Sequence, residues 1–251
     1  MKKQEKTRLF PLFQRLFLVA IFLLPYHLQA QSSHSLKTNI CQAQTGDYAV
    51  FSKGQQRFFL LVKSAEANHA WIEMTEFAHL SQQERTLAKD TPWKTLIHKL
   101  TSPRKVFLIY LSSSTVNIFC VNSKTGALDL LQKDDTMPFI ATLLQLSLNH
   151  APSHLVKTQG KNQDPWSPRV SLEGRASSVK VPTQAWHATW PHDTSILSGK
   201  NVLMYFTASE ISVFPVWASI DTPKGAIVLR AIDVGHEATS PYFYSLPKPQ
   251  E

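Results

Sequence analysis

Glycine is scarce in this chain, and the sequence motifs that depend on glycine are missing. The 251 residues include eight glycines, which lie singly and form neither a Gly-rich phosphate loop nor a Gly-x-Ser-x-Gly nucleophile elbow. The two cysteines and ten histidines show no spacing that is typical of a metal site. We therefore expect no cofactor and no bound metal, and the sequence favours a protein without enzymatic activity.

Excess charge is small once the N-terminal residues are set apart. The formal net charge is +8, but residues 1–30 carry five basic residues and one acidic residue, so they contribute half of it. The rest of the chain holds 21 basic and 17 acidic residues. That balance keeps a protein soluble and does not form the basic surface of a nucleic-acid binder. We expect no nucleic-acid partner.

A long hydrophobic run is also missing. Leu16–Leu24 is nine residues long, whereas a membrane-spanning helix needs ~20. Basic residues precede this run, Pro25 follows it, and Leu28-Gln29-Ala30 offers a small-residue cleavage site. The pattern predicts a cleaved signal peptide over 1–30, an exported protein and no transmembrane segment after cleavage. The alternative is that the same segment stays in place as an anchor.

Only two cysteines, Cys41 and Cys120, follow the signal segment. In an oxidising compartment two such thiols commonly pair, and closing a loop of about 80 residues would stabilise the fold by roughly 4 kcal/mol. We predict a Cys41–Cys120 disulfide. The alternatives are two free buried thiols, or a nucleophilic Cys120 with His150 or His154 as its base. The apolar surroundings of Cys120 favour an inert thiol over a reactive one.

Apolar residues are plentiful: they make up 43% of the chain and include six Trp and fourteen Phe, which predicts a packed core. We divide the chain after the signal into a flexible segment over 31–45, a β-rich segment with helices over 46–150, a loop or linker over 151–178, a β-rich segment over 179–245, and a tail over 246–251. A piece of about 70 residues buries a core poorly alone. We therefore expect 179–245 to form one domain with 46–150.

Two-residue periodicity and short turns predict a series of antiparallel strands. The predicted strands are Tyr48–Phe51, Arg57–Val62, Ala70–Thr75, Lys105–Leu111, Thr115–Asn122, Ala127–Leu131, Ser178–Val181, Lys200–Thr207, Ile211–Ile220 and Ala226–Asp233. Pro215 interrupts one of them and predicts an edge strand or a bulge there, because proline has no N–H to donate.

Helical spacing predicts three helices. Ser81–Lys89 begins with Ser81 and has Glu84 three residues later, which is a capping-box pattern. Thr91–Leu100 carries an apolar stripe, and Met137–Leu148 is apolar along most of its length. We predict an α+β fold, with a mainly antiparallel, curved β-sheet or half-barrel and two or three packed helices.

A hydrophobic ligand is the leading functional hypothesis. Many predicted strands are apolar on both faces, and Phe139 and Leu144 lie on the apolar helix Met137–Leu148, which could close the mouth of a curved sheet. We therefore expect non-enzymatic binding of a lipid or an apolar peptide. The architecture resembles that of periplasmic lipoprotein carriers at the level of fold alone.

The alternative is a glycan- or protein-binding envelope module that uses surface tryptophans. Trp186 and Trp190 are four residues apart, so they share a face in either a strand or a helix. With Trp217 they could form an aromatic platform. A core role competes with this interpretation, since each tryptophan buries a large apolar surface.

Two chemical interpretations of the same stretch have less support. His187, His192 and Asp193 could bind a metal, but the five-residue histidine spacing with Pro191 inside it is unlike known patterns. Ser195, His192 and Asp193 could form a hydrolase site, yet no nucleophile elbow accompanies them. Asp193 to Ser195 is instead typical of a turn in which side chains bind nearby backbone N–H groups.

Three stretches of the chain carry a family resemblance: Trp190–Lys200, Phe214–Trp217 and Arg230–Gly235. They resemble uncharacterised exported proteins of chlamydia-like bacteria. The resemblance implies the envelope of a Gram-negative bacterium, with the periplasm as the expected location and secretion as the alternative. It implies no activity and no functional residues.

Overall fold

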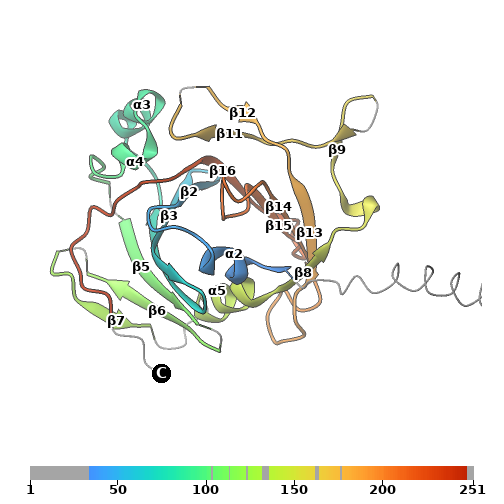
Figure 1. The fold of residues 1–251 in the computed structure, drawn as a ribbon, viewed down its shortest axis with the longest axis horizontal. Coiled ribbons are helices and arrows are strands. Elements are labelled where there is room, and N and C mark those ends of the chain that lie inside the picture. The colour runs from blue at the N-terminus through green and yellow to red at the C-terminus, as the bar shows by residue number, and fades with distance from the viewer. Residues whose placement is uncertain are drawn as a thin grey trace, which may run out of the picture. The chain divides into compact units, whose positions relative to one another are not determined.

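The computed structural model of the protein describes residues 34–102, 104–112, 114–122, 124–131, 136–161, 164–175 and 177–247. In these residues, backbone hydrogen bonds join fourteen strands into one sheet, which curves around two short helices (Figure 1). The predicted signal peptide over 1–30 lies outside the described residues. None of the helices in the described ranges is both long and apolar enough to cross a membrane.

Neighbouring strands along the main path of the sheet are all antiparallel. Their order is β1 (His34–Ser35), β8 (Ser147–His150), β13 (Gln184–Thr189), β14 (Asn201–Phe206), β15 (Trp217–Ile220), β16 (Ile227–Gly235), β2 (Tyr48–Lys53), β3 (Gln56–Glu66), β4 (His69–Phe77), β5 (Arg104–Leu111), β6 (Val116–Val121) and β7 (Leu128–Leu130). The strand β11 (Arg169–Leu172) branches off, parallel to β16 and antiparallel to β12 (Val179–Lys180). A separate pair joins β9 (Thr158–Gln159) and β10 (Asp164–Pro165).

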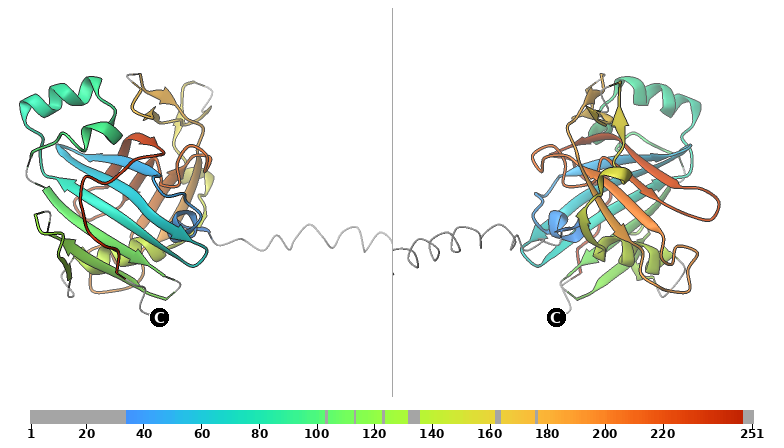
Figure 2. Two further views of the ribbon diagram at one scale, coloured as in Figure 1. Left: turned by 60° about the vertical axis from the view of Figure 1, so that its left-hand side comes forward. Right: turned by 90° about the vertical axis from the view of Figure 1, so that its right-hand side faces the viewer.

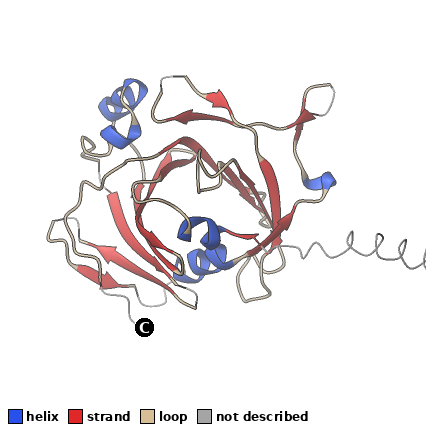
Figure 3. Ribbon diagram, viewed as in Figure 1, coloured by secondary structure: helices blue, strands red, loops and turns tan. Residues whose placement is uncertain are grey.

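The helices of the described residues are short. They are α2 (Leu36–Cys41), α3 (Gln82–Asp90), α4 (Trp93–Leu96) and α5 (Thr136–Gln145), with a 3-10 turn, η1 (Ser153–Leu155). Figure 3 shows α2 and α5 within the curve of the sheet and the other two α-helices outside it. Helix α2 contacts β3, β4 and α5, and α5 contacts β6.

The predicted α+β class with packed helices is therefore wrong. The fold is an open, mostly antiparallel sheet, and its α-helices have four to ten residues. The main error lies in Met137–Leu148, where α5 ends at Gln145 and β8 begins at Ser147. Leu146 and Leu148 are buried while Ser147 between them is exposed, so the leucines follow the two-residue period of a strand.

The start of the first predicted helix is confirmed in detail. Ser81 Oγ accepts a hydrogen bond from the Glu84 N–H, and the Glu84 carboxylate accepts one from the Ser81 N–H. The second predicted helix, Thr91–Leu100, is shortened to α4. Its apolar stripe is still core, because Trp93, Leu96, Ile97 and Leu100 are all buried.

The β2–β3 hairpin shows how alternation distributes side chains over the two faces of the sheet. Ala49 and Phe51 join the core around α2 and α5, whereas Tyr48 and Val50 join a second core beneath α3 and α4. Gly54 closes the hairpin turn with a φ of +58°, a conformation that glycine adopts without strain. A third core lies on the outer face, where residues 238–247 cross β4 to β6 (Figure 2).

Pro215 delays the start of the predicted strand Ile211–Ile220. The observed strand, β15, begins only at Trp217, because a proline cannot donate to a strand ladder. The expectation of an edge strand is wrong, since β15 pairs with β14 on one side and β16 on the other. Residues 211–215 instead continue the loop that follows β14, and Val216 bonds to Tyr205 and Ala231 as the chain enters the sheet.

Three segments without predicted secondary structure contain some. One is 182–199, where β13 forms over Gln184–Thr189. Within 31–45, which we expected to be flexible, the described part forms β1 and α2, and Leu36, Ile40 and Cys41 are buried there. Within 151–178 lie η1, β9, β10 and β11. These elements are two to six residues long, which is too short for a periodic pattern to reveal them.

The predicted Cys41–Cys120 disulfide is not formed, and both thiols are free. Cys41 ends α2, which packs on β3, β4 and α5, whereas Cys120 lies on β6, the strand that α5 contacts. A disulfide needs Cα atoms within about 7 Å of each other. Helix α5 thus lies between the elements that carry the two cysteines.

We expect two alkylatable thiols in the chain purified without reductant. After unfolding, both cysteines should react, whereas in the folded protein Cys41 should react slowly, because burial raises the pKa of its thiol and covers it. Mass spectrometry after alkylation in native buffer and in urea measures both quantities. A mass two hydrogens lower, with no alkylation in urea, would contradict the structure.

Candidate functional site

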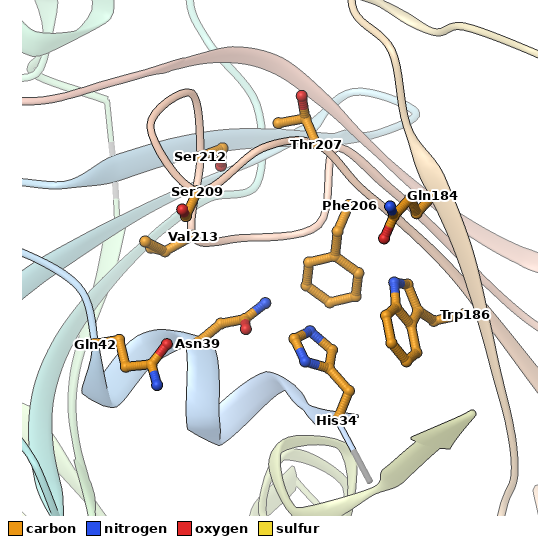
Figure 4. A pocket seen from close by; sticks show the side chains of 10 residues that line it. All are labelled: His34, Asn39, Gln42, Gln184, Trp186, Phe206, Thr207, Ser209, Ser212 and Val213. Carbon is orange, nitrogen blue, oxygen red and sulfur yellow. The ribbon is translucent and has the colours of Figure 1, made fainter. Parts of the chain in front are cut away.

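A pocket opens between α2 and the paired ends of β13 and β14 (Figure 4). Its volume is about 360 Å³, within the range of about 300–1,000 Å³ that is usual for small-molecule sites. The lining residues are His34, Asn39, Gln42, Gln184, Trp186, Phe206, Thr207, Ser209, Ser212 and Val213. Four of them belong to the segment after β14, residues 207–213, which we call the 207–213 loop.

Aromatic rings form one side of the pocket. The ring of Trp186 stacks on that of His34, which also lines the pocket, and on that of His150, with centroid distances of 4.4 and 4.2 Å. The ring of Phe206 meets His34 edge-on at 5.5 Å. The strand register produces this arrangement, because Trp186 lies opposite His150 and His34 lies opposite Leu148 in neighbouring strand pairs. Trp186 is 9% exposed, so only a small part of its ring is open to a ligand.

The other side of the pocket is polar and neutral. Amide side chains come from α2, the residue after it and β13, and hydroxyls come from the 207–213 loop. Thr207 Oγ1 is buried and has no hydrogen-bond partner among the described residues. Leaving a buried hydroxyl unpaired costs about 1–3 kcal/mol. In Figure 4 the Thr207 hydroxyl points away from the other labelled side chains, whereas the Gln184 amide points into the pocket and is a group that a bound ligand can reach.

No lining side chain carries a fixed charge, and the one titratable group is held neutral. Burial lowers the pKa of His34, and the charge of nearby His150 lowers it further. Its ordinary value is 6.5, so the His34 imidazole is uncharged at neutral pH. A pocket without charge selects a neutral ligand, because a buried ion would find no counter-charge there.

Trp190, one of the predicted platform residues, is core instead. Its side chain is 2% exposed, and its ring stacks on that of Phe139 at a centroid distance of 5.5 Å. The indole Nε1 donates to Asp193 Oδ2 at 3.0 Å. Leu144 is buried on the same helix as Phe139. These three residues tie α5 to the end of β13.

Trp217 lies in a different aromatic cluster. Its ring packs edge-on against those of Tyr205 and Trp166, at 5.4 and 5.7 Å, and Lys157 Nζ lies 3.6 Å from its centroid. The side chain is 4% exposed. The three predicted tryptophans therefore form no common surface platform, and of these three Trp186 alone lines the pocket.

The predicted hydrolase set does not assemble. Ser195 Oγ donates to Asp193 Oδ1 at 2.7 Å, and the Ser195 N–H donates to the same oxygen at 2.9 Å. In a Ser-His-Asp set the imidazole, here that of His192, would have to accept from the Ser195 hydroxyl. The Asp193 side chain closes the turn onto backbone, as its spacing predicted. His187 bonds to Asn201, and no group of three potential metal ligands occurs in the described residues.

The sequence missed most of the pocket. His34, Asn39 and Gln42 lie in the segment that we expected to be flexible. Most of the 207–213 loop was assigned to the predicted strands Lys200–Thr207 and Ile211–Ile220, which in the structure are shorter. One signal was available: Ser35 precedes Leu36 and Ile40, which is a cap followed by helical spacing. The structure shows the cap, since the Thr38 N–H donates to Ser35 Oγ at 3.1 Å.

The fold and pocket define a mainly β, single-sheet protein with a neutral aromatic pocket. The sequence model of the CT021 protein family matches residues 58–178. A solved structure of the hypothetical protein CT021 from Chlamydia trachomatis is 38% identical, with a TM-score of 0.71, and the match covers 86% of this chain and 99% of that one. The chain therefore belongs to the CT021 protein family. No curated protein matches it.

The resemblance to uncharacterised chlamydial proteins is thus confirmed. It extends well beyond the three C-terminal stretches from which we inferred it, because the matched family region ends at residue 178, before the first of them begins. The descriptions of the two matches name neither an activity nor a ligand.

Proposed function

We propose that this protein is a non-enzymatic binding protein of the bacterial envelope that takes a neutral sugar ring of a glycan into the pocket beside Trp186. The observation that carries the proposal is the combination of an aromatic wall, an uncharged lining and the amide side chains opposite that wall. This is the glycan-binding alternative, moved from a platform of three tryptophans to a pocket that contains one of them.

A sugar ring has the two properties that such a pocket selects. Its hydroxyls donate and accept hydrogen bonds, which matches amide side chains such as those of Asn39 and Gln184, since an amide offers both kinds of group. Its C–H faces are apolar and can pack against aromatic edges such as that of Phe206. A charged ligand gains nothing from this lining, which supports a neutral ring over a phosphate or a carboxylate.

The location forms part of the proposal. The basic, apolar and small-residue parts of residues 1–30 support export, and an exported chain of this family works in the envelope, in the periplasm or beyond it. Envelope glycans are accessible there. Fractionation of cells that express the full chain, with N-terminal sequencing of the product, tests both the location and cleavage after Ala30.

Gln184→Met is expected to weaken binding of a neutral sugar about five- to tenfold, because methionine keeps the length of glutamine but offers no amide to the ligand. The measurement is a titration with the disaccharide of N-acetylglucosamine, followed by tryptophan fluorescence. Gln83→Met is the control, since Gln83 is exposed on α3 and outside the pocket. Equal affinities in the two variants would contradict the assignment of Gln184.

Binding of a hydrophobic ligand stays a prediction, and it would require a rearrangement of the core. The inner face of the sheet is packed with the chain's own residues, including Leu144 of α5, so a lipid would have to displace a helix. Native mass spectrometry of residues 31–251 separates the two hypotheses. Lipid that survives gentle purification, together with no saturable sugar signal, would replace our proposal with a carrier.

A further inference from the structure

The imidazole of His236 bridges two separate segments of the chain just after β16. Its Nδ1 lies 2.6 Å from Asp47 Oδ1, and its Nε2 lies 2.9 Å from the carbonyl oxygen of Glu210. A carbonyl oxygen and an ionised carboxylate can only accept hydrogen bonds. Both ring nitrogens must therefore carry a proton, so the geometry is that of the cationic imidazolium.

Neither acceptor lines the pocket, but each is close in the chain to residues that do. Glu210 lies in the middle of the 207–213 loop, next to Ser209. Asp47 uses its second oxygen, Oδ2, to accept from the Gln44 N–H at 2.8 Å, two residues beyond the lining residue Gln42. His236 thus connects the loop to the segment that follows α2, although it does not line the pocket itself.

We propose that protonated His236 is a positioning residue that holds the 207–213 loop against the α2 side of the pocket, so that ligand binding weakens when His236 loses its proton. The ligand part of this inference rests on the proposed function, whereas the loop part rests on the contacts alone. A neutral imidazole has one N–H. It keeps the short bond to Asp47 and turns a lone pair toward the Glu210 carbonyl, which releases the loop.

The backbone of His236 is fixed separately from its ring. Its N–H donates to Glu173 Oε1 at 2.6 Å, and Lys94 Nζ pairs with Glu173 Oε2 at 2.7 Å. Gly235 leaves room for this contact, because a Cβ there would meet Glu173 Oε1 at 2.3 Å. Deprotonation therefore acts on the ring contacts and leaves the anchor of the chain in place.

The charges that face His236 favour its proton. They are Asp47 from the turn before β2, Glu173 from the bend after β11, and Lys94 from α4. The positive charge of Lys94 is paired with the carboxylate of Glu173. The hydrogen bond to Asp47 raises the pKa of His236 above its ordinary 6.5; burial opposes this, and the Glu210 carbonyl and the two carboxylates add to the rise. A raised pKa means that the stabilisation is complete below 6.5 and is lost as pH rises through the folded value.

The test measures two quantities on the folded full chain between pH 5 and pH 9. One is the affinity for the N-acetylglucosamine disaccharide, followed by tryptophan fluorescence. The other is the hydrogen-exchange protection of the Ile211 and Ser212 amides, which bond to Ala208 O within the loop, corrected for the intrinsic rate. We expect both to fall about five- to tenfold as pH rises, the effect of losing one hydrogen bond.

His236→Gln should remove the pH dependence and show the high-pH values of the natural protein throughout. Asp47→Asn is the second variant: it keeps the ring and should move the midpoint of both curves to lower pH, because the carboxylate that favours the proton is gone. His187→Gln is the control, since His187 lies on β13, bonds to Asn201 and has no contact with the loop.

The outcomes separate the two proposals. If the disaccharide binds at no pH while loop protection still follows the protonation of His236, the proposed sugar site fails and the positioning role stands. If loop protection in the natural protein does not change with pH, or if His236→Gln changes with pH in the same way, the positioning role is overturned, whatever the sugar does.

Discussion

Replacing Trp190 with alanine is expected to lower the free energy of unfolding by about 3–5 kcal/mol. The side chain is 2% exposed, stacks on Phe139 and belongs to the core around α2 and α5, so the substitution leaves a cavity that α5 and β13 cannot easily close. It also removes the indole donor to Asp193. Urea denaturation at pH 7 measures the change.

Ile196→Ala is the matched control for this substitution. Ile196 lies in the turn after β13 and is 71% exposed, so its loss should change stability by less than about 0.5 kcal/mol. A Trp190→Ala protein with unchanged stability and lost glycan binding would reverse the assignment and make Trp190 a surface binding residue.

Glu84→Ala is expected to lower the free energy of unfolding by about 3 kcal/mol or more at neutral pH, since three backbone donors lose an ionised acceptor. The Glu84 carboxylate accepts from the N–H groups of Ser81, Thr101 and Ser102, at 2.6 to 2.9 Å, and from the Ser102 hydroxyl. It thereby joins the start of α3 to the segment that leads into β5. The side chain is almost completely buried.

The effect of Glu84 has a defined pH dependence. Burial raises the pKa of this carboxyl, but the hydrogen bonds from Ser102, Ser81 and Thr101 outweigh it and lower the pKa from 4.5 to about 2. That difference corresponds to about 3 kcal/mol, present in full above pH 4.5 and lost as pH falls toward 2. The difference in the free energy of unfolding between Glu84→Gln and the natural protein should therefore be about half as large at pH 3 as at pH 7.

Asp90→Asn controls for the loss of a carboxylate as such. Asp90 ends the same helix and is exposed, so removing its charge should change stability by less than about 0.5 kcal/mol at any of these pH values. If the stability of Glu84→Gln and of Asp90→Asn changed with pH in the same way, the hydrogen bonds of Glu84 would not be the cause of the pH dependence.

Local sequence patterns predicted much of the sheet, because the signal they use is local. The hairpin of β2 and β3 consists of two apolar runs on either side of the turn at Gly54, and the Ser81 and Glu84 pair marks the start of α3; both are patterns within a few residues. The errors arose where two periods fit the same residues. Leu146 and Leu148 fit a helical stripe by composition. Leu148 belongs to β8 because that strand pairs with β1 and β13, which are distant in the sequence, and Leu146 lies just before β8.

The candidate site could be predicted only in part. Trp186 was identified because tryptophan is rare and conspicuous, but its pocket partners come from three regions that no local pattern connects. His34 reaches Trp186 through the pairing of β1 with β8 and of β8 with β13, and β1 is more than a hundred residues away from both of the other strands. Thr207 and Ser212 line the pocket because β14 ends at Phe206 and β15 begins only after Pro215, which leaves a loop between the two strands.

The pairing of β2 with β16 imposes an order of events on the newly made chain. Tyr48 and Asp233, which hydrogen-bond in the finished sheet, are 185 positions apart. Strand β2 is therefore made long before its partner β16, and the two cannot pair until β16 has been synthesised. Contacts of such long range make folding slow, and until Ile227–Gly235 arrives the edge of β2 is bare and able to pair with other chains. The sheet therefore cannot form completely before synthesis has reached the end of β16. We expect the protein to aggregate most readily during that time.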